Sequence, residues 1–325
     1  MILEKIRLFI SKNVAFAGLI FVVIAGGLIN PLFLTPENMN NMLRFASIIG
    51  FVAIGMTFVI LCGSIDLSTS SVFAFAGFLF ITLGQKTPAL AIVIPILAGM
   101  AIGLVNGFLV TKMSIPAFVG TLATMIFVRS LVLICTKETT INGGNIAPFL
   151  KFLGRGNVFP YVSMPFVLFI ILTILVAYMM KKMPVGRAMY IVGGNPEAAK
   201  MMGVSPQKTL FTAHIFCGAM AAFGGIIFAS RIGSALPLAG TGYELYAIAS
   251  VVIGGAELSG GKGKISGTFF GALVMGSFSN IFNMQRILNA VWQNVVIGAV
   301  LLLVIFIQAL MASPVVMKKR KNIRV

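Results

Sequence analysis

The dominant pattern along the chain is a series of long apolar runs separated by short polar segments. Several of these runs reach the roughly 20 residues that an α-helix needs to cross a bilayer. The pattern predicts an all-α polytopic membrane protein with about ten transmembrane helices, organised as one domain over residues 1–325. The runs cover about 14–33, 42–62, 70–84, 89–110, 115–135, 162–180, 209–230, 243–254, 265–284 and 290–311.

Two of the runs, 70–84 and 243–254, are shorter than the others. Short or glycine-interrupted spans often line a central pathway, because irregular backbone is tolerated in a membrane only where protein shields it from lipid. We therefore expect these two segments to lie near the centre of the molecule.

The composition supports a membrane protein and argues against a metal site or an enzymatic active site. The chain is 59% hydrophobic and 10% charged, whereas soluble domains are about 25% charged. Its single histidine, His214, lies in an apolar run, and its three cysteines have no metal-binding spacing. Neither an HExxH sequence nor a nucleophile elbow is present. We therefore expect a protein that is not an enzyme, with no catalytic residue and no metal site.

The distribution of positive charge predicts the orientation. With ten spans and the N-terminus inside, 16 of the 24 lysines and arginines fall in inner segments and six in outer ones. Such a bias places both termini in the cytoplasm. The net charge of +17 then follows from topology and from attraction to anionic lipid, so no nucleic-acid partner is expected. The same topology makes 181–208 a cytoplasmic loop and 136–161 an external loop.

The cytoplasmic loop 181–208 contains the signals of a very short helix. Asn195 can cap the helix with its side-chain oxygen, and Pro196 suits the first helical position. Gly203 can adopt the left-handed conformation that closes a helix. The helical part is about two turns, or roughly 10 Å, which is marginal alone in water.

One face of this short helix carries Ala198, Met201 and Met202 at helical spacing. Exposed methionines suit docking into the groove of a partner. The alternative interpretation is an ordinary loop helix folded back onto its own protein. The cytoplasmic position favours docking, because it removes any role in meeting an external solute.

Two charged residues lie in or beside apolar runs and are candidate pathway residues. Asp66 ends the second run, where it can bind an ion or a substrate or, as we favour, start the next helix as a cap. Arg129 lies within the fifth run, where it can line a hydrophilic route, pair with Asp66 or a backbone carbonyl, or reach the outer surface.

The glycine-rich stretch 254–263 superficially matches a phosphate-binding loop. Gly261 stands where that loop needs a lysine, and Lys262 is followed by Gly263 rather than by Ser or Thr. The stretch is therefore predicted to be a flexible cytoplasmic turn without a nucleotide. Beyond it, Gly267 and Gly271 form a small-xxx-small pair suited to close helix packing.

Four motifs in order carry a resemblance to a known family. They are Ile65-Asp66-Leu67-Ser68, Ile115-Pro116-Ala117-Phe118, Tyr190 with Gly193-Gly194-Asn195 and Ala198-Ala199, and Leu258-Ser259-Gly260-Gly261. The set resembles the permease subunits of ribose-type bacterial ABC sugar importers, and among them the galactofuranose permeases, over about residues 42–308. Ser64 and Thr69-Ser70 depart from the family pattern beside Asp66, so the substrate stays open.

The resemblance implies partners and roles. It implies a dimeric permease core in the bacterial inner membrane, built from two copies or two paralogues, with a separate ABC ATPase and an extracytoplasmic sugar-binding protein. The chain itself would need no cofactor, because the ATPase subunit hydrolyses the ATP. The family's ATPase-coupling pattern falls here on Gly193, Gly194, Asn195, Ala198, Ala199 and Gly203.

Two other functions remain as alternatives. One keeps the ABC class but changes the cargo to nucleosides or branched-chain amino acids. The other is a stand-alone secondary transporter, which would normally carry acidic residues within the membrane for ion coupling. In this chain the acids near spans, Asp66, Glu244 and Glu257, all lie close to span boundaries.

Overall fold

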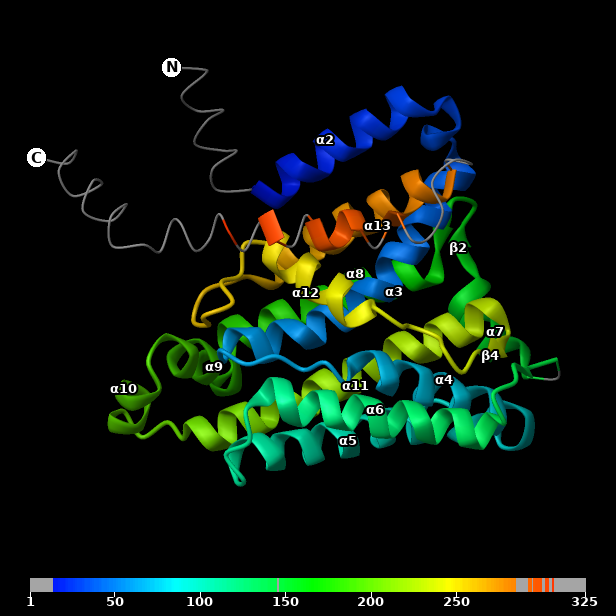
Figure 1. The fold of residues 1–325 in the computed structure, drawn as a ribbon. Helices are drawn as coiled ribbons and strands as arrows, with labels where there is room; N and C mark the ends of the chain where they lie inside the picture. Colours follow the sequence, from blue (N-terminus) through cyan, green and yellow to red (C-terminus); the bar gives the residue numbers. More distant parts are fainter. Residues whose placement is uncertain are drawn as a thin grey trace, which may run out of the picture.

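The computed structural model describes residues 14–144, 146–284, 292–293, 295–299, 302–303 and 306. Helices make up most of these residues (Figure 1). Their bounds are α2 (Val14–Ile29), η1 (Pro31–Leu34), α3 (Pro36–Leu61), α4 (Thr69–Lys86), η2 (Pro88–Leu90), α5 (Val93–Thr111), α6 (Ala117–Thr136), α7 (Pro148–Arg155), α8 (Met164–Lys182), α9 (Pro184–Gly194), α10 (Pro196–Met201), α11 (Pro206–Ile232), α12 (Tyr243–Ile253) and α13 (Ile265–Met284).

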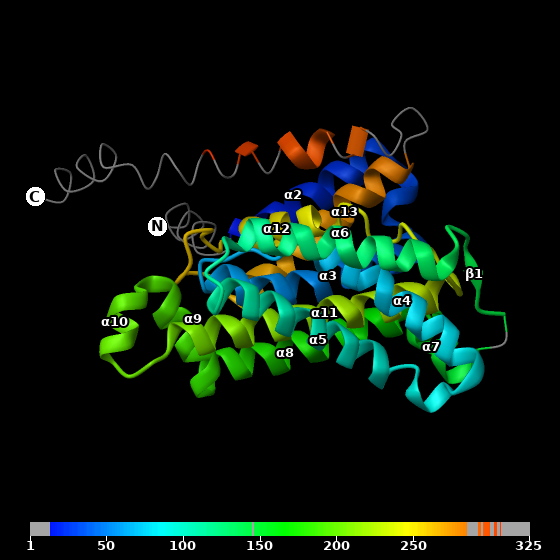
Figure 2. The same ribbon diagram turned by 60° about the horizontal axis from the view of Figure 1, so that its bottom comes forward.

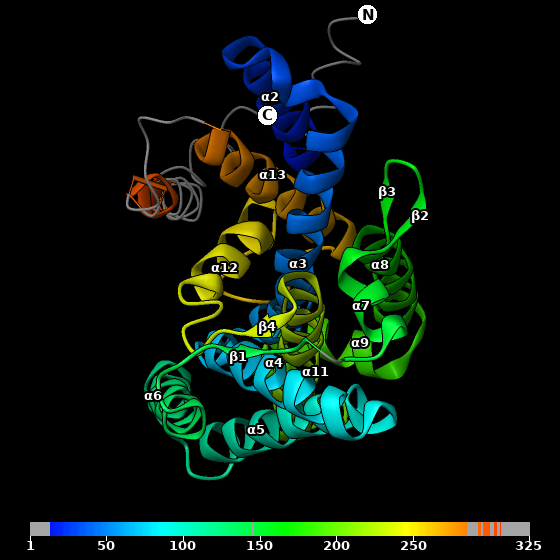
Figure 3. The same cartoon turned by 90° about the vertical axis from the view of Figure 1, so that its right-hand side faces the viewer.

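Two short antiparallel ribbons complete the described structure. Strand β1 (Ile141–Asn142) pairs with β4 (Ser234–Ala235). Strand β2 (Asn157–Phe159) pairs with β3 (Val162–Ser163) across an irregular register. Both ribbons and α7 lie at the predicted outer end of the bundle, which faces the viewer in Figure 3, whereas α9 and α10 lie at the opposite end (Figures 1 and 2).

The predicted all-α polytopic membrane fold is confirmed. Among the described residues, six helices are long and apolar enough to cross a membrane: α3, α5, α6, α8, α11 and α13. Two further apolar helices, α12 and the segment Ala15–Ile29, are shorter. The tenth predicted run, 290–311, lies mostly outside the described residues. The total of about ten spans and the cytoplasmic position of both termini therefore stay predictions.

Helices α3 and α11 form the centre of the bundle (Figure 2). In the most apolar part of α3, 83% of the residues are buried, compared with 28% in α5 and 22% in α8. Aromatic side chains fill the centre, where the ring of Phe51 packs edge-on against those of Phe169 and Phe223. The outer helices expose large apolar side chains such as Ile174 and Phe127, as a surface in contact with lipid requires.

Glycines bring helix backbones unusually close at two interfaces. A Cβ added to Gly103 of α5 would lie 2.3 Å from the carbonyl oxygen of His214 in α11. Likewise, a Cβ on Gly267 or Gly271 of α13 would lie about 2 Å from backbone oxygens of 254 and 250, at the end of α12. The close packing predicted for Gly267 and Gly271 is therefore confirmed. These contacts fix α5 on α11 and α13 on α12.

Two non-helical segments interrupt the helical bundle. They directly precede the two short apolar runs, 70–84 and 243–254. After α3, the chain returns along the bundle as the extended segment 64–67, and α4 starts part-way along the helices (Figure 1). After β4, residues 236–242 lead in the same way to α12. Because α12 has only 11 residues, it is about 16 Å long and covers roughly half of a 30 Å hydrocarbon core.

Candidate functional site

A buried polar cluster lies at the start of α4. It is formed by Asp66 and Ser68 from the interrupted segment, Asn106 from α5 and His214 from α11, each at most 2% exposed. We call these four residues the Asp66 cluster. The close approach of α5 to α11 at Gly103 brings Asn106 and His214 to the same place.

Asp66 is the common acceptor of the cluster. Its carboxylate accepts from the Ser68 backbone N–H at 2.9 Å and from the Ser68 hydroxyl at 2.6 Å. Asn106 donates to both carboxylate oxygens, at 3.2 and 3.3 Å, and His214 Nδ1 lies 3.0 Å from Oδ2. A carboxylate oxygen accepts, so Nδ1 carries the proton. The Asp66–Ser68 bonds turn the chain at the start of α4, and the other bonds anchor that turn to α5 and α11.

Two atoms of the Asp66 cluster have no hydrogen-bond partner among the described residues. They are His214 Nε2 and Asn106 Oδ1, both buried. Buried polar groups are normally paired, because an unpaired one loses its bond to water without replacement. The cluster therefore combines strong anchoring with unused hydrogen-bonding capacity inside the bundle.

Arg129 joins the two interrupted segments. Its Nη1 donates to the carbonyl oxygens of Pro237 at 2.9 Å and Ala239 at 2.8 Å, which precede α12. Its Nη2 donates to the carbonyl of Ser70 in the first turn of α4, at 2.9 Å. Backbone at an interrupted span inside a membrane needs partners for the polar groups that no regular helix satisfies. Of the roles expected for Arg129, the structure thus shows pairing with backbone carbonyls, and it does not show pairing with Asp66.

Glu244 in the first turn of α12 lies close enough to Arg129 for the two charges to interact. Its Oε2 atom is buried and has no hydrogen-bond partner among the described residues. Glu244 is the second residue of α12, so it lies at the boundary of that span, as the sequence predicts.

The short helix α10 has the caps that the sequence predicts. The Asn195 side chain accepts from the backbone N–H groups of Glu197 at 2.9 Å and Ala198 at 3.1 Å. Gly203 closes the helix with a positive φ of 79°. Ala199 is fully buried and Ala198 partly so, whereas Met201 is 90% exposed and Met202 67% exposed. The methionine face is therefore open, at the end of the bundle that carries α9 and α10 (Figure 1).

A junction of closely packed backbone connects α9 to the end of α3 and to the loop after α12. It comprises residues 61–63, 193–194 and 260–263, which we call the glycine junction. Gly261 N–H donates to the carbonyl of Leu61 at 2.9 Å. A Cβ on Gly193 would lie 1.7 Å from that same carbonyl oxygen and 2.5 Å from the nitrogen of Gly261. No side chain other than hydrogen fits at Gly193.

Tyr190 adds a side-chain bond to the glycine junction. Its hydroxyl donates to the carbonyl of Gly263 at 3.1 Å. Partial burial raises the pKa of Tyr190 above its ordinary value of 10, so the hydroxyl keeps its proton at neutral pH and remains a donor.

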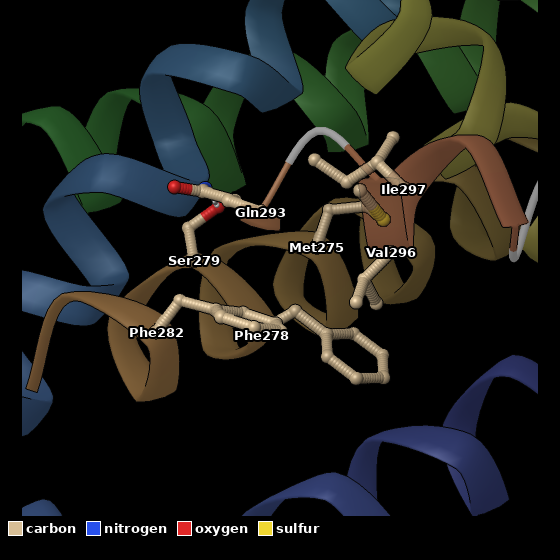
Figure 4. A pocket seen from close by; sticks show the side chains of 7 residues that line it. All are labelled: Met275, Phe278, Ser279, Phe282, Gln293, Val296 and Ile297. Atoms are coloured by element: carbon tan, nitrogen blue, oxygen red, sulfur yellow. Dashed lines mark hydrogen bonds between the residues drawn. The ribbon is translucent and has the colours of Figure 1, made fainter. Parts of the chain in front are cut away.

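A small pocket lies between α13 and the side chains of Gln293, Val296 and Ile297 (Figure 4). Gln293 Nε2 donates to Ser279 Oγ on one side of it, at 2.7 Å. The space holds roughly one water and is too small for a sugar ring. Its lining residues are Met275, Phe278, Ser279, Phe282, Gln293, Val296 and Ile297.

Comparison with known proteins identifies the class of this chain. Residues 38–305 match the family described as branched-chain amino acid transport system / permease component. The chain belongs to this permease family. It is a multi-pass inner-membrane protein, and its family is a class of transport permeases rather than of enzymes. ABC permeases of this kind work with an ATPase and a binding protein.

The similarity to known permeases covers most of this chain. The ribose import permease protein RbsC of Bacillus subtilis is 37% identical over 294 residues, which is 90% of this chain and 91% of the relative. The L-arabinose permease AraH of Azospirillum brasilense is 33% identical, covering 85% and 80%. The D-allose permease AlsC of Escherichia coli is 30% identical, covering 90% of each. The predicted resemblance to ribose-type permeases is thereby confirmed. No solved structure matches the chain.

Proposed function

We propose that this permease is the transmembrane subunit of an ATP-driven importer for a monosaccharide. The observation that carries the proposal is similarity over about 90% of the chain to permeases named for ribose and allose, and over 85% to one named for arabinose. The description of the matching family names branched-chain amino acids, so an amino-acid cargo is the second candidate. A nucleoside cargo and a stand-alone transporter have no observation in their favour.

The proposed pathway lies where the two spans are interrupted. Interrupted spans expose backbone and polar side chains within the protein, as a hydroxylated solute requires. Asp66 and Arg129 are the candidate residues, and they act by holding the ends of α4 and α12 in place. Arg129 has the more direct role in holding α4 and α12, because its side chain binds backbone at both interrupted spans.

The proposed energy source is a separate ABC ATPase that docks on α10. The exposed Met201 and Met202 suit an apolar groove, and the Asn195 cap and the Gly203 turn hold the helix in shape. Closure of the ATPase on ATP would push α9 and α10 and change the accessible side of the pathway. The coupling residues are Gly193, Gly194, Asn195, Ala198, Ala199 and Gly203.

The remaining partners complete the importer. An extracytoplasmic sugar-binding protein would deliver the substrate, and a second permease, either another copy or a paralogue, would form the other half of the core. The chain would use no cofactor of its own, because the ATPase hydrolyses the ATP. Lipid surrounds the bundle, and no nucleic-acid partner is proposed.

The test is a reconstituted complex with the permease, the ATPase and the binding protein in liposomes. Asn195→Ala removes a helix cap worth about 1 kcal/mol and should lower uptake per ATP hydrolysed, with membrane insertion intact. Asn142→Ala at the opposite end of the bundle is the control. Unchanged uptake in both Asn195→Ala and Gly203→Ala would count against docking at α10. Binding-protein affinities for pentoses, hexoses, nucleosides and leucine separate the candidate cargoes.

A further inference from the structure

We propose that Tyr190 is a positioning residue that ties the α9–α10 segment to both interrupted spans, so that they move with it in either direction. The inference rests on the proposed function, because it concerns how motion of α10 reaches the pathway. It is carried by the contacts of the glycine junction and by a side-chain hydrogen bond that crosses it, from the Tyr190 hydroxyl to the Gly263 carbonyl.

The glycine junction transmits movement of α9 toward the bundle to the segments that α9 contacts. The backbone of Gly193 lies directly against the Leu61 carbonyl on one side and against the backbone of Gly261 on the other. A Cβ on Gly261 would lie 2.7 Å from the backbone of Gly194, and one on Gly260 would lie 2.7 Å from the nitrogen of Gly63. Backbone in direct contact cannot be compressed as flexible side chains can. Movement of α9 toward the bundle therefore displaces both neighbouring segments.

The loop 256–263, which contains residues 260–263, is held closed by hydrogen bonds between its own residues. The backbone N–H of Glu257 donates to the carbonyl of Lys262 at 3.0 Å, and the Lys262 ammonium lies 3.0 Å from the Glu257 carboxylate. The ion pair is exposed and weak, so the backbone bond provides most of the closure. The loop thus moves as a unit between the end of α12 and the start of α13.

Packing contacts resist approach but do not resist separation. A hydrogen bond resists separation, and the described residues place two such bonds across the junction. Gly261 N–H to Leu61 O joins the end of α3 to the loop after α12. Tyr190 hydroxyl to Gly263 O joins α9 to the loop after α12. The Tyr190 bond is therefore the contact through which α9 pulls when it moves away from the bundle.

Both segments held at the junction lead into the interrupted spans. Residues 61–63 continue to Asp66, whose side chain is anchored to His214 and Asn106. The loop 256–263 follows α12, which is preceded by the carbonyls that Arg129 binds. A displacement at the junction is thus delivered to the two segments that Arg129 joins.

The experiment measures ATP hydrolysed per sugar imported in liposomes that contain permease, ATPase and binding protein. Tyr190→Phe removes only the hydroxyl. The matched control is Tyr178→Phe in α8, where the side chain is 62% exposed and makes no hydrogen bond to any described residue. The expected result is a ratio raised roughly fivefold in Tyr190→Phe, the factor that corresponds to one ordinary hydrogen bond, and unchanged in the control.

The ratio of ATP hydrolysed to sugar imported distinguishes a loss of coupling from a loss of folded permease. If Tyr190→Phe lowers ATP hydrolysis and uptake together, the residue has only a structural role and the inference is overturned. An unchanged ratio also overturns it. Absence of ATP-dependent uptake with the unaltered permease defeats the proposed function instead, so the two failures are distinguishable.

Discussion

Arg129 should contribute more to stability than any exposed arginine of the chain, because it holds three carbonyls of two interrupted segments. Arg129→Met removes all three bonds and leaves the carbonyls of Pro237, Ala239 and Ser70 without this partner. Side-chain bonds in membrane proteins average about 0.6 kcal/mol each, and bonds to charged groups in soluble proteins about 1.5 or more. Three such bonds give a loss of about 2 to 4.5 kcal/mol.

The assay is the free energy of unfolding of the purified permease in mixed micelles, titrated with a denaturing detergent. Arg187→Met is the control, because its guanidinium is exposed and makes a single bond of 3.3 Å to Lys182 O. The control should lose less than about 0.5 kcal/mol. Arg129→Lys should recover only part of the loss, because an ammonium lacks the planar fork that reaches separate acceptors. Equal stabilities of Arg129→Met and Arg187→Met would refute the reasoning.

Two further predictions concern the junction and the Asp66 cluster. Gly193→Ala, whose Cβ would lie 1.7 Å from a backbone oxygen, should abolish ATP-dependent uptake, whereas Gly18→Ala in α2, with open space around its Cβ, should keep it; loss in both variants would contradict the packing argument. Asp66→Ala should cost about 3 kcal/mol of unfolding free energy, because it leaves the buried donors of His214 and Ser68 unpaired. Combined with His214→Phe it should cost less than the sum of the single changes, and additive costs in the double-mutant cycle would be evidence against the shared cluster.

Local signals were sufficient to predict part of the structure. The first nine runs of apolar residues match helices of the described structure, and short length marks the two interrupted spans. The caps of α10 were also predictable, because Asn195, Pro196 and Gly203 act on residues within one or two turns of themselves. Such features depend on chain geometry over a few residues, which a single sequence contains in full.

The Asp66 cluster and the role of Arg129 depend on distant residues and could not be predicted. His214 is 148 positions from Asp66, and no pattern within a few residues of either one indicates that they pair. Arg129 binds carbonyls 59 to 110 positions away, which any residue could supply. A signal did exist in the glycine series 99, 103 and 107 of α5, since closely packed helices bring their polar residues together. These glycines predict that α5 packs closely against another helix, but they do not indicate which helix that is.

Uptake of labelled sugar into liposomes tests the central claim most directly. The permease, the ABC ATPase and the binding protein are reconstituted together and then with each component left out. The account predicts accumulation that requires all three proteins and ATP, and no ATP hydrolysis or driven uptake by the permease alone. Uptake by the permease alone under a proton or sodium gradient, without ATP, would contradict it.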